Sequence, residues 1–266
     1  MATGKILRLL ILAVSVHFPA HFAAAATVYD VRSFGANRDG KSDSTEAFLS
    51  AWAATCAAPG RATIYIPPGK YLLGSVNFTG HGCRSKSITI RMDGTLVAPA
   101  NYNVIGNNGH WIFFNSVAGV SLYGGTLDGQ GKKLWTCKKS GKTCPEGTTS
   151  LVFYESSNIR IRGLTSLNSQ MFHILIDGCR NVSLVDTKIA APGSSPNTDG
   201  IHVRRSTNVT IVHSNIGTGD DCISIGPGST HLWIENLSCG PGHGVSKIYS
   251  ISFNDIIIHL MTSLSV

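Results

Sequence analysis

The sequence predicts an all-β fold, a parallel β-helix in which one helix covers the amino-terminal end of the coil stack. Short strand-like runs recur every 20-odd residues, which is the period of one coil in such a solenoid. Glycine is abundant, with 29 among 266 residues, and charged residues make up only 14%, a composition that favours short strands and turns over long helices. A chain of this length can build one large domain with a continuous core.

Residues 1–26 have the pattern of a secretory signal peptide. Lys5 and Arg8 give a positively charged start, an apolar run extends from 6 to 16, and small residues at 23–26 form a cleavage region. The alternative, a membrane anchor, is disfavoured because the apolar run is short and is followed by histidines and a proline. We therefore expect a secreted, extracellular protein.

The remaining chain, 27–266, has a modest positive charge. Without Lys5 and Arg8, 20 basic residues stand against 15 acidic ones, a net charge of about +5. Such a charge on a secreted protein suits acidic polysaccharides, including those of a cell wall. No basic stripe is interleaved with aromatic residues, so nucleic acid is not an expected partner. We expect a monomer with no membrane partner, no metal and no cofactor.

Seven cysteines fit an oxidising compartment. Their spacing makes three disulfides plausible, and these are Cys137–Cys144, Cys222–Cys239 and Cys56–Cys83. Cys179 is left over and is expected to be buried as a small apolar residue. Four N-x-S/T sequons are candidates for glycosylation, at Asn77, Asn181, Asn208 and Asn236.

The first structured region is predicted to be the cap. After a short strand and a Gly/Asp-rich turn, Ser44 marks the start of the best helical stretch in the chain, 46–56. One face of this stretch is apolar and consists of Ala47, Phe48, Ala51 and Trp52. Because the open end of a solenoid must be covered to stay soluble, we expect this helix to cover it.

Strand-like runs follow the cap, each bounded by turn residues: 63–66, 87–92, 111–114, 120–123 and 151–154. Two repeating series come next. An Asn-apolar-polar-apolar pattern begins at Asn158, Asn181 and Asn208, and a second apolar series begins at Ile174, Ile201, Ile223 and Val245. Both series contain one step of 27 residues, which places an inserted loop at 191–196.

The fixed long period argues for a parallel β-helix over two other folds. An antiparallel sandwich would show hairpin turns without such a period, and a leucine-rich repeat needs a Leu/Asn consensus that this sequence lacks. The recurring Asn158, Asn181 and Asn208 are expected to form an inward ladder that satisfies backbone groups at the turns.

Asp199, Asp221 and His243 show a further regularity. They are 22 residues apart, and each lies two positions before an apolar strand residue. Coils stack about 4.8 Å apart, so we expect the three side chains to form one patch. Asp220 can join them only if the chain bends near Gly219, because neighbours in a regular strand face opposite sides. Taken singly, each of these four residues could be an ordinary turn or surface residue. The register shared by Asp199, Asp221 and His243 is what favours a functional site.

Carboxylates clustered in this way cannot all ionise at their usual pKa, so one is expected to hold a proton. A protonated acid beside ionised ones is what hydrolysis of a glycosidic bond requires. The competing chemistry is calcium-dependent elimination, in which acids hold the metal and a basic residue takes the proton. Arg204 and Arg205 are near in sequence but do not share the register, so hydrolysis is favoured.

Three motifs make this interpretation specific, namely Ser195-Pro-Asn-Thr-Asp-Gly200, Gly219-Asp-Asp-Cys-Ile-Ser-Ile225 and Cys239-Gly-Pro-Gly-His-Gly244. Over roughly 28–246 the chain resembles the polygalacturonases of glycoside hydrolase family 28. The resemblance implies a right-handed β-helix and inverting hydrolysis of α-1,4-galacturonosidic bonds in pectin or polygalacturonate. The Phe172-His173 pair and the insertion around Cys137 and Cys144 are most similar to the exo-acting plant branch.

The resemblance also implies roles for individual residues. Asp220 corresponds to the general acid, whereas Asp199 and Asp221 correspond to the carboxylates that orient and deprotonate water. His243 is expected to assist substrate binding or to tune the acid. Asn197 is expected to bind substrate.

After Ser246 the family pattern is lost, since further coils and a substrate-binding Arg-Ile-Lys motif are expected but do not occur in 247–266. We therefore expect the catalytic domain, 27–266, to be a truncated product in which 255–261 form an improvised last strand. Two alternatives to an active hydrolase stay open. One is a catalytically inactive family member or weak pectin binder, and the less favoured one is a calcium-dependent pectate lyase.

Overall fold

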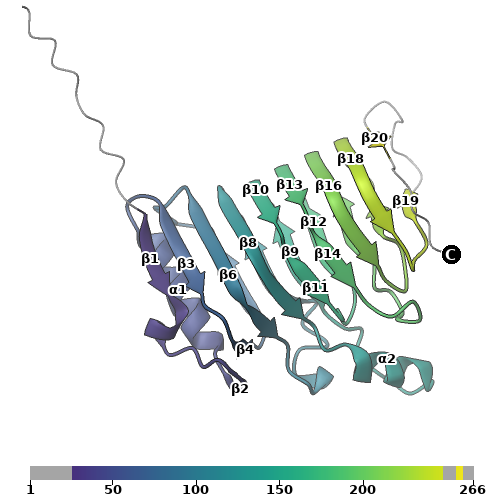
Figure 1. Cartoon of the computed structure of the whole chain (residues 1–266), viewed down its shortest axis with the longest axis horizontal. Helices are drawn as coiled ribbons and strands as arrows, with labels where there is room; N and C mark the ends of the chain where they lie inside the picture. The colour runs from purple at the N-terminus through teal and green to yellow at the C-terminus, as the bar shows by residue number, and fades with distance from the viewer. Residues whose placement is uncertain (1–25, 248–255, 260–266) are drawn as a thin grey trace, which may run out of the picture.

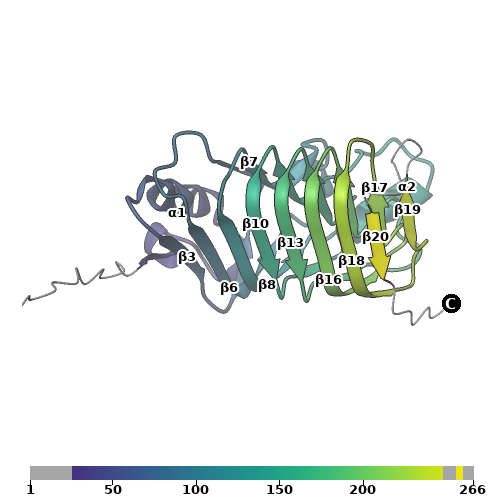
Figure 2. The ribbon, with the colours of Figure 1, turned by 90° about the horizontal axis from the view of Figure 1, so that it is seen from above.

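A computed structural model describes residues 26–247 and 256–259 of the chain. They form a right-handed parallel β-helix, as predicted, whose coils stack in chain order along the long axis (Figure 1). Neighbouring strands of a sheet therefore come from successive coils, as the row from β8 to β18 shows from above (Figure 2). The predicted signal peptide lies outside the described residues except for Ala26. Neither α-helix in the described part of the chain is long and apolar enough to cross a membrane.

Two sheets build the walls of the solenoid, and all the pairings between their strands are parallel. The larger sheet has thirteen strands: β1 (Thr27–Asp30), β2 (Asp39–Asp43), β3 (Ala62–Ile66), β4 (Lys70–Leu72), β6 (Ile88–Val97), β8 (Val120–Asp128), β10 (Ser157–Arg162), β11 (Thr165–Leu167), β13 (Arg180–Val185), β14 (Lys188–Ala190), β16 (Thr207–Gly217), β18 (Thr230–Cys239) and β20 (Ile256–His259). The other has seven: β5 (Val76–Thr79), β7 (His110–Asn115), β9 (Thr149–Tyr154), β12 (Ile174–Asp177), β15 (Ile201–Arg204), β17 (Ile223–Ile225) and β19 (Val245–Lys247).

The amino-terminal cap is the helix α1 (Thr45–Ala57), and Ser44 is its N-cap residue, as the sequence predicts. Its apolar face is buried against the first coils. The Trp52 ring lies 5.1 Å from that of Phe78 and 5.6 Å from that of Phe114, and its indole N–H donates to the carbonyl of Thr79 at 3.0 Å. The cap is thus joined to the solenoid by aromatic packing and one partly buried hydrogen bond.

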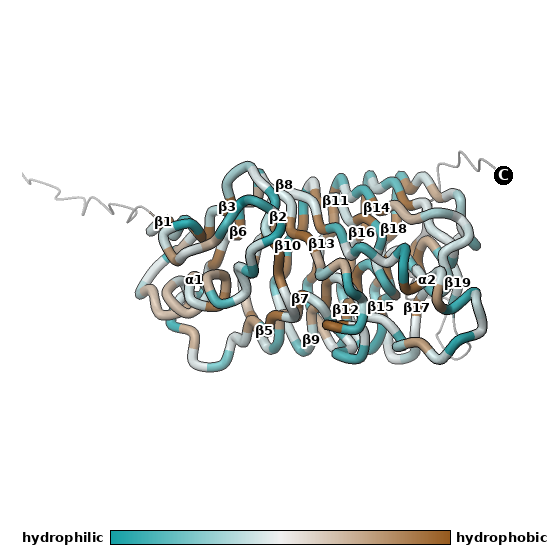
Figure 3. The backbone as a smooth tube through the Cα atoms, turned by 90° about the horizontal axis from the view of Figure 1, so that it is seen from below, coloured by the Kyte–Doolittle hydropathy of each residue, from teal (hydrophilic) through white to brown (hydrophobic). Residues whose placement is uncertain are grey.

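The core consists of apolar side chains that repeat from coil to coil. In the larger sheet Ile159, Val182, Val209 and Leu232 occupy one register position, and all four are buried. Figure 3 shows hydrophobic stretches recurring at strands such as β5, β10 and β13. Because each inward position is filled by the same kind of residue in successive coils, the 20-odd-residue period could be recognised in the sequence.

The asparagine ladder exists, but it lies on the outside of the solenoid. The Nδ2 of Asn181 donates to Oδ1 of Asn158 at 3.0 Å, and Nδ2 of Asn208 donates to Oδ1 of Asn181 at 2.8 Å. All three side chains are exposed, so the predicted inward ladder is wrong. Each asparagine has a φ of 56°, in the left-handed region that asparagine tolerates better than most residues.

Cysteines form the three disulfides considered from the sequence, Cys56–Cys83, Cys137–Cys144 and Cys222–Cys239. Cys179 is free and fully buried, and its burial raises the pKa of the thiol to about 11.

Further along the chain, the strand expected at 255–261 is present as β20 (Ile256–His259), which pairs with β18.

A second helix, α2 (Lys132–Lys139), was not predicted. It lies on the outside of the solenoid, beside the loops that follow β11 and β14 (Figure 1). Only Leu134 and Trp135 are buried in it, so it has no long apolar period that would mark a helix in the sequence. The Cys137–Cys144 disulfide ties its last turn to the following loop.

Candidate active site

Asp199, Asp221 and His243, which are 22 residues apart in the sequence, lie at the entrances of three stacked strands. Asp199 precedes β15, Asp221 precedes β17 and His243 precedes β19, and Ile201, Ile223 and Val245 pair in register. Backbone hydrogen bonds continue this stacking into the site. The amide of Gly200 donates to the carbonyl of Asp221 at 2.8 Å, and the amide of Cys222 donates to that of Gly244 at 2.8 Å.

Asp220 and Asp221 share the site because the chain bends at Gly219 and Asp220. A Cβ on Gly219 would lie 2.0 Å from the carbonyl oxygen of Ser195, so only glycine fits this close approach. The amide of Gly219 donates to Oγ1 of Thr198 at 3.0 Å, which fixes the bend to the preceding coil. The backbone of Asp221 then donates to Oδ1 of Asp220 at 2.9 Å.

Asp220 faces His243 in the next coil. The imidazole Nδ1 lies 3.3 Å from Oδ1 of Asp220, and the His243 side chain is 68% exposed whereas that of Asp220 is 27% exposed. The amide of His243 also donates to the carbonyl of Asp220 at 3.0 Å. This pair is therefore the solvent-accessible part of the site, where a substrate oxygen can reach the carboxyl group.

Asp199 is the buried member of the cluster, at 7% exposure. Burial raises the pKa of Asp199, a hydrogen bond from Ser224 partly offsets this, and the charges of Asp220 and Asp221 raise the pKa further. The Ser224 hydroxyl donates to Oδ2 of Asp199 at 2.6 Å. The raised pKa thus belongs to the carboxyl group farthest from solvent.

Besides the column formed by Asp199, Asp221 and His243, a second column of polar residues supports the acids from inside the solenoid. The sequence interpretation missed this second column. His202, Ser224 and Ser246 pair in register, again 22 residues apart. Ser224 donates to Asp199, and Ser246 donates to Oδ2 of Asp221. The same period that revealed the acids could have revealed these residues, because each lies three positions after a member of the first column.

His202 extends this support to an aromatic side chain. Its Nδ1 lies 2.7 Å from Oγ of Ser224, and because that hydroxyl gives its hydrogen to Asp199, Nδ1 is the donor. The imidazole stacks on Phe172 with ring centroids 5.0 Å apart. Burial lowers the pKa of His202, so the ring holds its single hydrogen on Nδ1 and stays neutral.

The remaining predicted residues lie apart from these contacts or have other partners. Asn197 is exposed, with a φ of 54°, and among the described residues its side chain has no hydrogen bond. Arg204 and Arg205 both bind the buried carboxylate of Asp177, at 2.8 Å and 2.7 Å. Arg204 is the last residue of β15 and Arg205 follows it, whereas Asp199 precedes the strand, so the basic residues considered for elimination are engaged at its other end.

Asp220, Asp221 and His243 are also the group that could hold a cation. One ligand atom from each lies within 4.8 Å of the others. Two carboxylates suit a hard divalent ion, but the imidazole is a softer donor than the oxygen ligands calcium prefers. The donor set is therefore incomplete as a calcium site without further oxygen ligands.

The protein is thus a parallel β-helix with carboxyl groups at the entrances of successive strands. Residues 56–255 match the family described as glycosyl hydrolases family 28, and the chain belongs to this family. It is 55% identical to a polygalacturonase of Prunus persica over 224 residues, 84% of this chain and 57% of the relative. It is 42% identical to an exopolygalacturonase of Zea mays, over 82% of this chain and 53% of the relative.

Solved structures agree with this assignment. The endo-xylogalacturonan hydrolase of Aspergillus tubingensis superposes with a TM-score of 0.72 at 26% identity, over 84% of this chain and 60% of that chain. A polygalacturonase of Erwinia carotovora shares the fold, with a TM-score of 0.63 at 23% identity, over 84% of this chain and 67% of that chain. The chain spans about half the length of the curated relatives it matches.

Proposed function

We propose that the protein hydrolyses α-1,4-galacturonosidic bonds in pectin or polygalacturonate by an inverting acid–base mechanism. The observation that carries this proposal is the meeting of three carboxyl groups and one imidazole at the entrances of stacked strands, Asp199, Asp220, Asp221 and His243. The relationship to polygalacturonases supports the substrate class.

Asp220 acts as the general acid in this mechanism. Its carboxyl group is accessible from solvent, so it can reach the oxygen of the scissile bond and transfer a proton to the leaving sugar. The Nδ1 of His243 lies 3.3 Å from Oδ1 of Asp220, so the imidazole can donate to the carboxylate that remains after the proton transfer, and it contacts the substrate from the exposed side.

Asp199 and Asp221 act as the pair that orients and deprotonates the water. A carboxylate with a raised pKa is a stronger base, and the burial of Asp199 supports this role. Ser224 and Ser246 hold one oxygen of each carboxylate, which leaves the other oxygen for the water. Because water attacks from the side opposite the general acid, the configuration at the anomeric carbon inverts.

The protein acts from chain ends, outside the cell, on the pectin of a cell wall. Relatives named exopolygalacturonase, at 40–42% identity, support action at chain ends. Three disulfides support an extracellular location, because such bonds persist in oxidising compartments.

Reducing-sugar release from polygalacturonate, measured with and without a calcium chelator, tests the reaction. Release that persists with chelator is expected for hydrolysis. Unsaturated products formed without chelator, together with loss of release when chelator is added, would instead identify a lyase. No release from folded protein would identify the inactive, pectin-binding alternative.

Replacing Asp220 tests the assignment of the acid. Asp220→Asn should lower the hydrolysis rate by about 10²–10⁴-fold, the usual contribution of general acid catalysis, without changing the fold. Asp186→Asn is a matched control, because Asp186 is an exposed surface carboxylate, paired with Arg162. An undiminished rate in Asp220→Asn would remove Asp220 from the acid role.

A further inference from the structure

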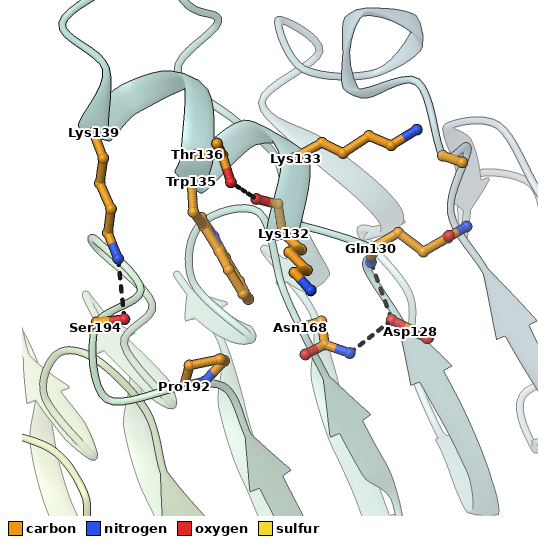
Figure 4. A pocket seen from close by; sticks show the side chains of 11 residues that line it. Asp128, Gln130, Lys132, Lys133, Trp135, Thr136, Lys139, Asn168, Pro192 and Ser194 are labelled. Carbon is orange, nitrogen blue, oxygen red and sulfur yellow. Dashed lines mark hydrogen bonds between the residues drawn. The ribbon is translucent and has the colours of Figure 1, made fainter.

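A groove of about 610 Å³ lies at the opposite ends of the strands from the acid cluster, which consists of Asp199, Asp220, Asp221 and His243. Glu155, Gly178 and Arg205 line the groove and follow β9, β12 and β15, whereas Asp199 precedes β15. The four residues of β15, about 13 Å of strand, therefore separate the groove from the acids. The lysine-lined cavity beside helix α2 differs, because its wall is the loop that leads into Asp199 (Figure 4).

Arg205 is held in this groove by a buried carboxylate. Asp177, whose side chain is 2% exposed, accepts at Oδ1 from Nε of Arg205 at 2.8 Å and at Oδ2 from Nε of Arg204 at 2.9 Å. The guanidinium of Arg205 also lies 5.9 Å from the centre of the Tyr154 ring, and its side chain is 57% exposed. One carboxylate neutralises only one of the two guanidinium groups. A positive charge therefore remains at the groove, on a side chain that is already fixed and loses little freedom when it binds.

Arg160 and Arg180 add positive charge that no acid neutralises. Neither forms a salt bridge within residues 26–247 and 256–259. Arg180 lines the groove and pairs in register with Ser157, and Arg160 lies three residues beyond Ser157 on β10. Arg160 belongs to β10, Arg180 to the neighbouring β13, and Arg205 to the turn before β16. The three arginines thus come from three successive coils and form a line of charge along the solenoid.

The outer face of the larger sheet continues the groove. Asn181 lines both the groove and a neighbouring hollow of about 220 Å³, which Arg160, Ser183 and Thr210 also line. Arg160, Ser183, Thr210 and Trp233 occupy one register position in successive coils, a row of about 14 Å, and Trp233 is 37% exposed. The groove and this row together are termed the distal surface. A linear polymer lying along it meets guanidinium groups first, then an amide and hydroxyl groups, and then an indole ring.

We propose that the distal surface binds an acidic polysaccharide without cleaving it, and so anchors the protein to a polymer. Charge complementarity identifies the partner, because guanidinium groups bind carboxylates through paired, charge-assisted hydrogen bonds and an exposed indole packs on a sugar ring. Glu155 is the one acid in the two linings, so the pair of carboxyl groups that cleavage of a glycosidic bond requires does not occur there. The inference rests on the proposed function for the choice of polymer, whereas the location of the surface does not depend on it.

Retention on immobilised polygalacturonate tests the proposal. Asp220→Asn serves as the background, so that the polymer is not consumed. Arg160→Gln with Arg180→Gln should weaken retention by about 5–10-fold at low salt, because each change removes one exposed, partly screened contact with a carboxylate. Arg205 is kept, because it also neutralises the buried Asp177. On fully methyl-esterified pectin, which has no free carboxylates, the double variant and its parent should be retained equally.

Arg61→Gln with Arg84→Gln is the matched control and should keep full retention. Both arginines are exposed near the amino-terminal cap, and neither has a salt bridge in the described part of the chain. Full retention of the Arg160/Arg180 variant would overturn the proposal. Equal losses in the two double variants would also overturn it, because net charge alone would then explain the binding.

Calorimetry with a galacturonate dimer separates the distal surface from the acid cluster. The dimer is too short to reach from one to the other, so its affinity at the acid cluster should be the same with and without Arg160 and Arg180. A loss for the dimer as large as that for the polymer would place the two arginines at the acid cluster and overturn the proposal. Intact retention without any sugar release by the unmodified protein would count against the proposed function instead, so the two failures are distinguishable.

Discussion

The hydroxyl of Ser224 donates to Oδ2 of Asp199 at 2.6 Å, across the boundary between two coils. Ser246 repeats this relationship with Asp221 one coil further on. Each acid is therefore held by the serine of the following coil, and the stacking of the solenoid sets the orientation of the carboxylates.

Ser224→Ala should lower kcat for polygalacturonate by about 10–100-fold, since a loosened carboxylate orients water less well. The hydrogen bond also lowers the pKa of Asp199, so its loss should raise that pKa and move the acidic limb of the pH–rate profile to higher pH. Ser121→Ala, on β8, is the matched control. A purely structural role for Ser224 would change stability without moving the limb.

Asp199→Asn should abolish hydrolysis and stabilise the protein at pH 7 by about 1 kcal/mol. Folding raises the pKa of Asp199, so the folded state binds this proton more tightly, and stability is lost as pH rises through the raised pKa. The amide cannot ionise and avoids this loss. Urea unfolding should therefore show an advantage for the variant at pH 7 that disappears below about pH 3.8, and an equal advantage at both pH values would contradict the argument.

His173 should make the protein less stable in acid. It is fully buried, and burial lowers its pKa to about 3 from 6.5. The unfolded chain therefore binds a proton that the folded chain does not, and stability falls between about pH 6.5 and pH 3, by up to about 1.4 kcal/mol per pH unit. His173→Asn should remove this slope in urea titrations, whereas replacing the exposed His81 should leave it unchanged.

Asn77 should be the sequon that carries a glycan. It is exposed on β5, and its amide has no hydrogen bond among the described residues. The amides of Asn181 and Asn208 donate within the ladder, and a sugar on Nδ2 would compete with the neighbouring rung. Glycopeptide mass spectrometry of secreted protein should find the glycan lost in Asn77→Gln and unaffected in Asn181→Gln. A fully occupied Asn181 would contradict this prediction.

The fold could be predicted because its determinants repeat. Inward positions such as Ile159, Val182 and Val209 are apolar in each coil, so the strands and their register were visible in the sequence. The sequence did not reveal that the asparagine ladder lies on the outside, because the direction of each side chain depends on the left-handed φ of that asparagine. Helix α2 was missed because only two of its side chains are buried.

The candidate site could be predicted in part for the same reason. Asp199, Asp221 and His243 share one register, and the bend at Gly219 that brings Asp220 beside them is marked by its glycine. Which carboxyl group has the raised pKa could not be predicted, because that depends on burial. Asp199 is the buried one, whereas the resemblance placed the proton-donating role on Asp220.

The loop 191–196 contacts helix α2 through Ser194, which accepts a hydrogen bond from Lys139 at 3.0 Å, and it packs on Gly219 through Ser195. Its Gly193 is also close to Pro241, since a Cβ there would lie 3.1 Å from the proline ring. A redesign of this loop would therefore also displace Asp220 and Asp221, which follow the bend at Gly219. Lys132 and Lys133 of α2 make no side-chain hydrogen bond to this loop in the described part of the chain, so substitutions there would leave the bend in place.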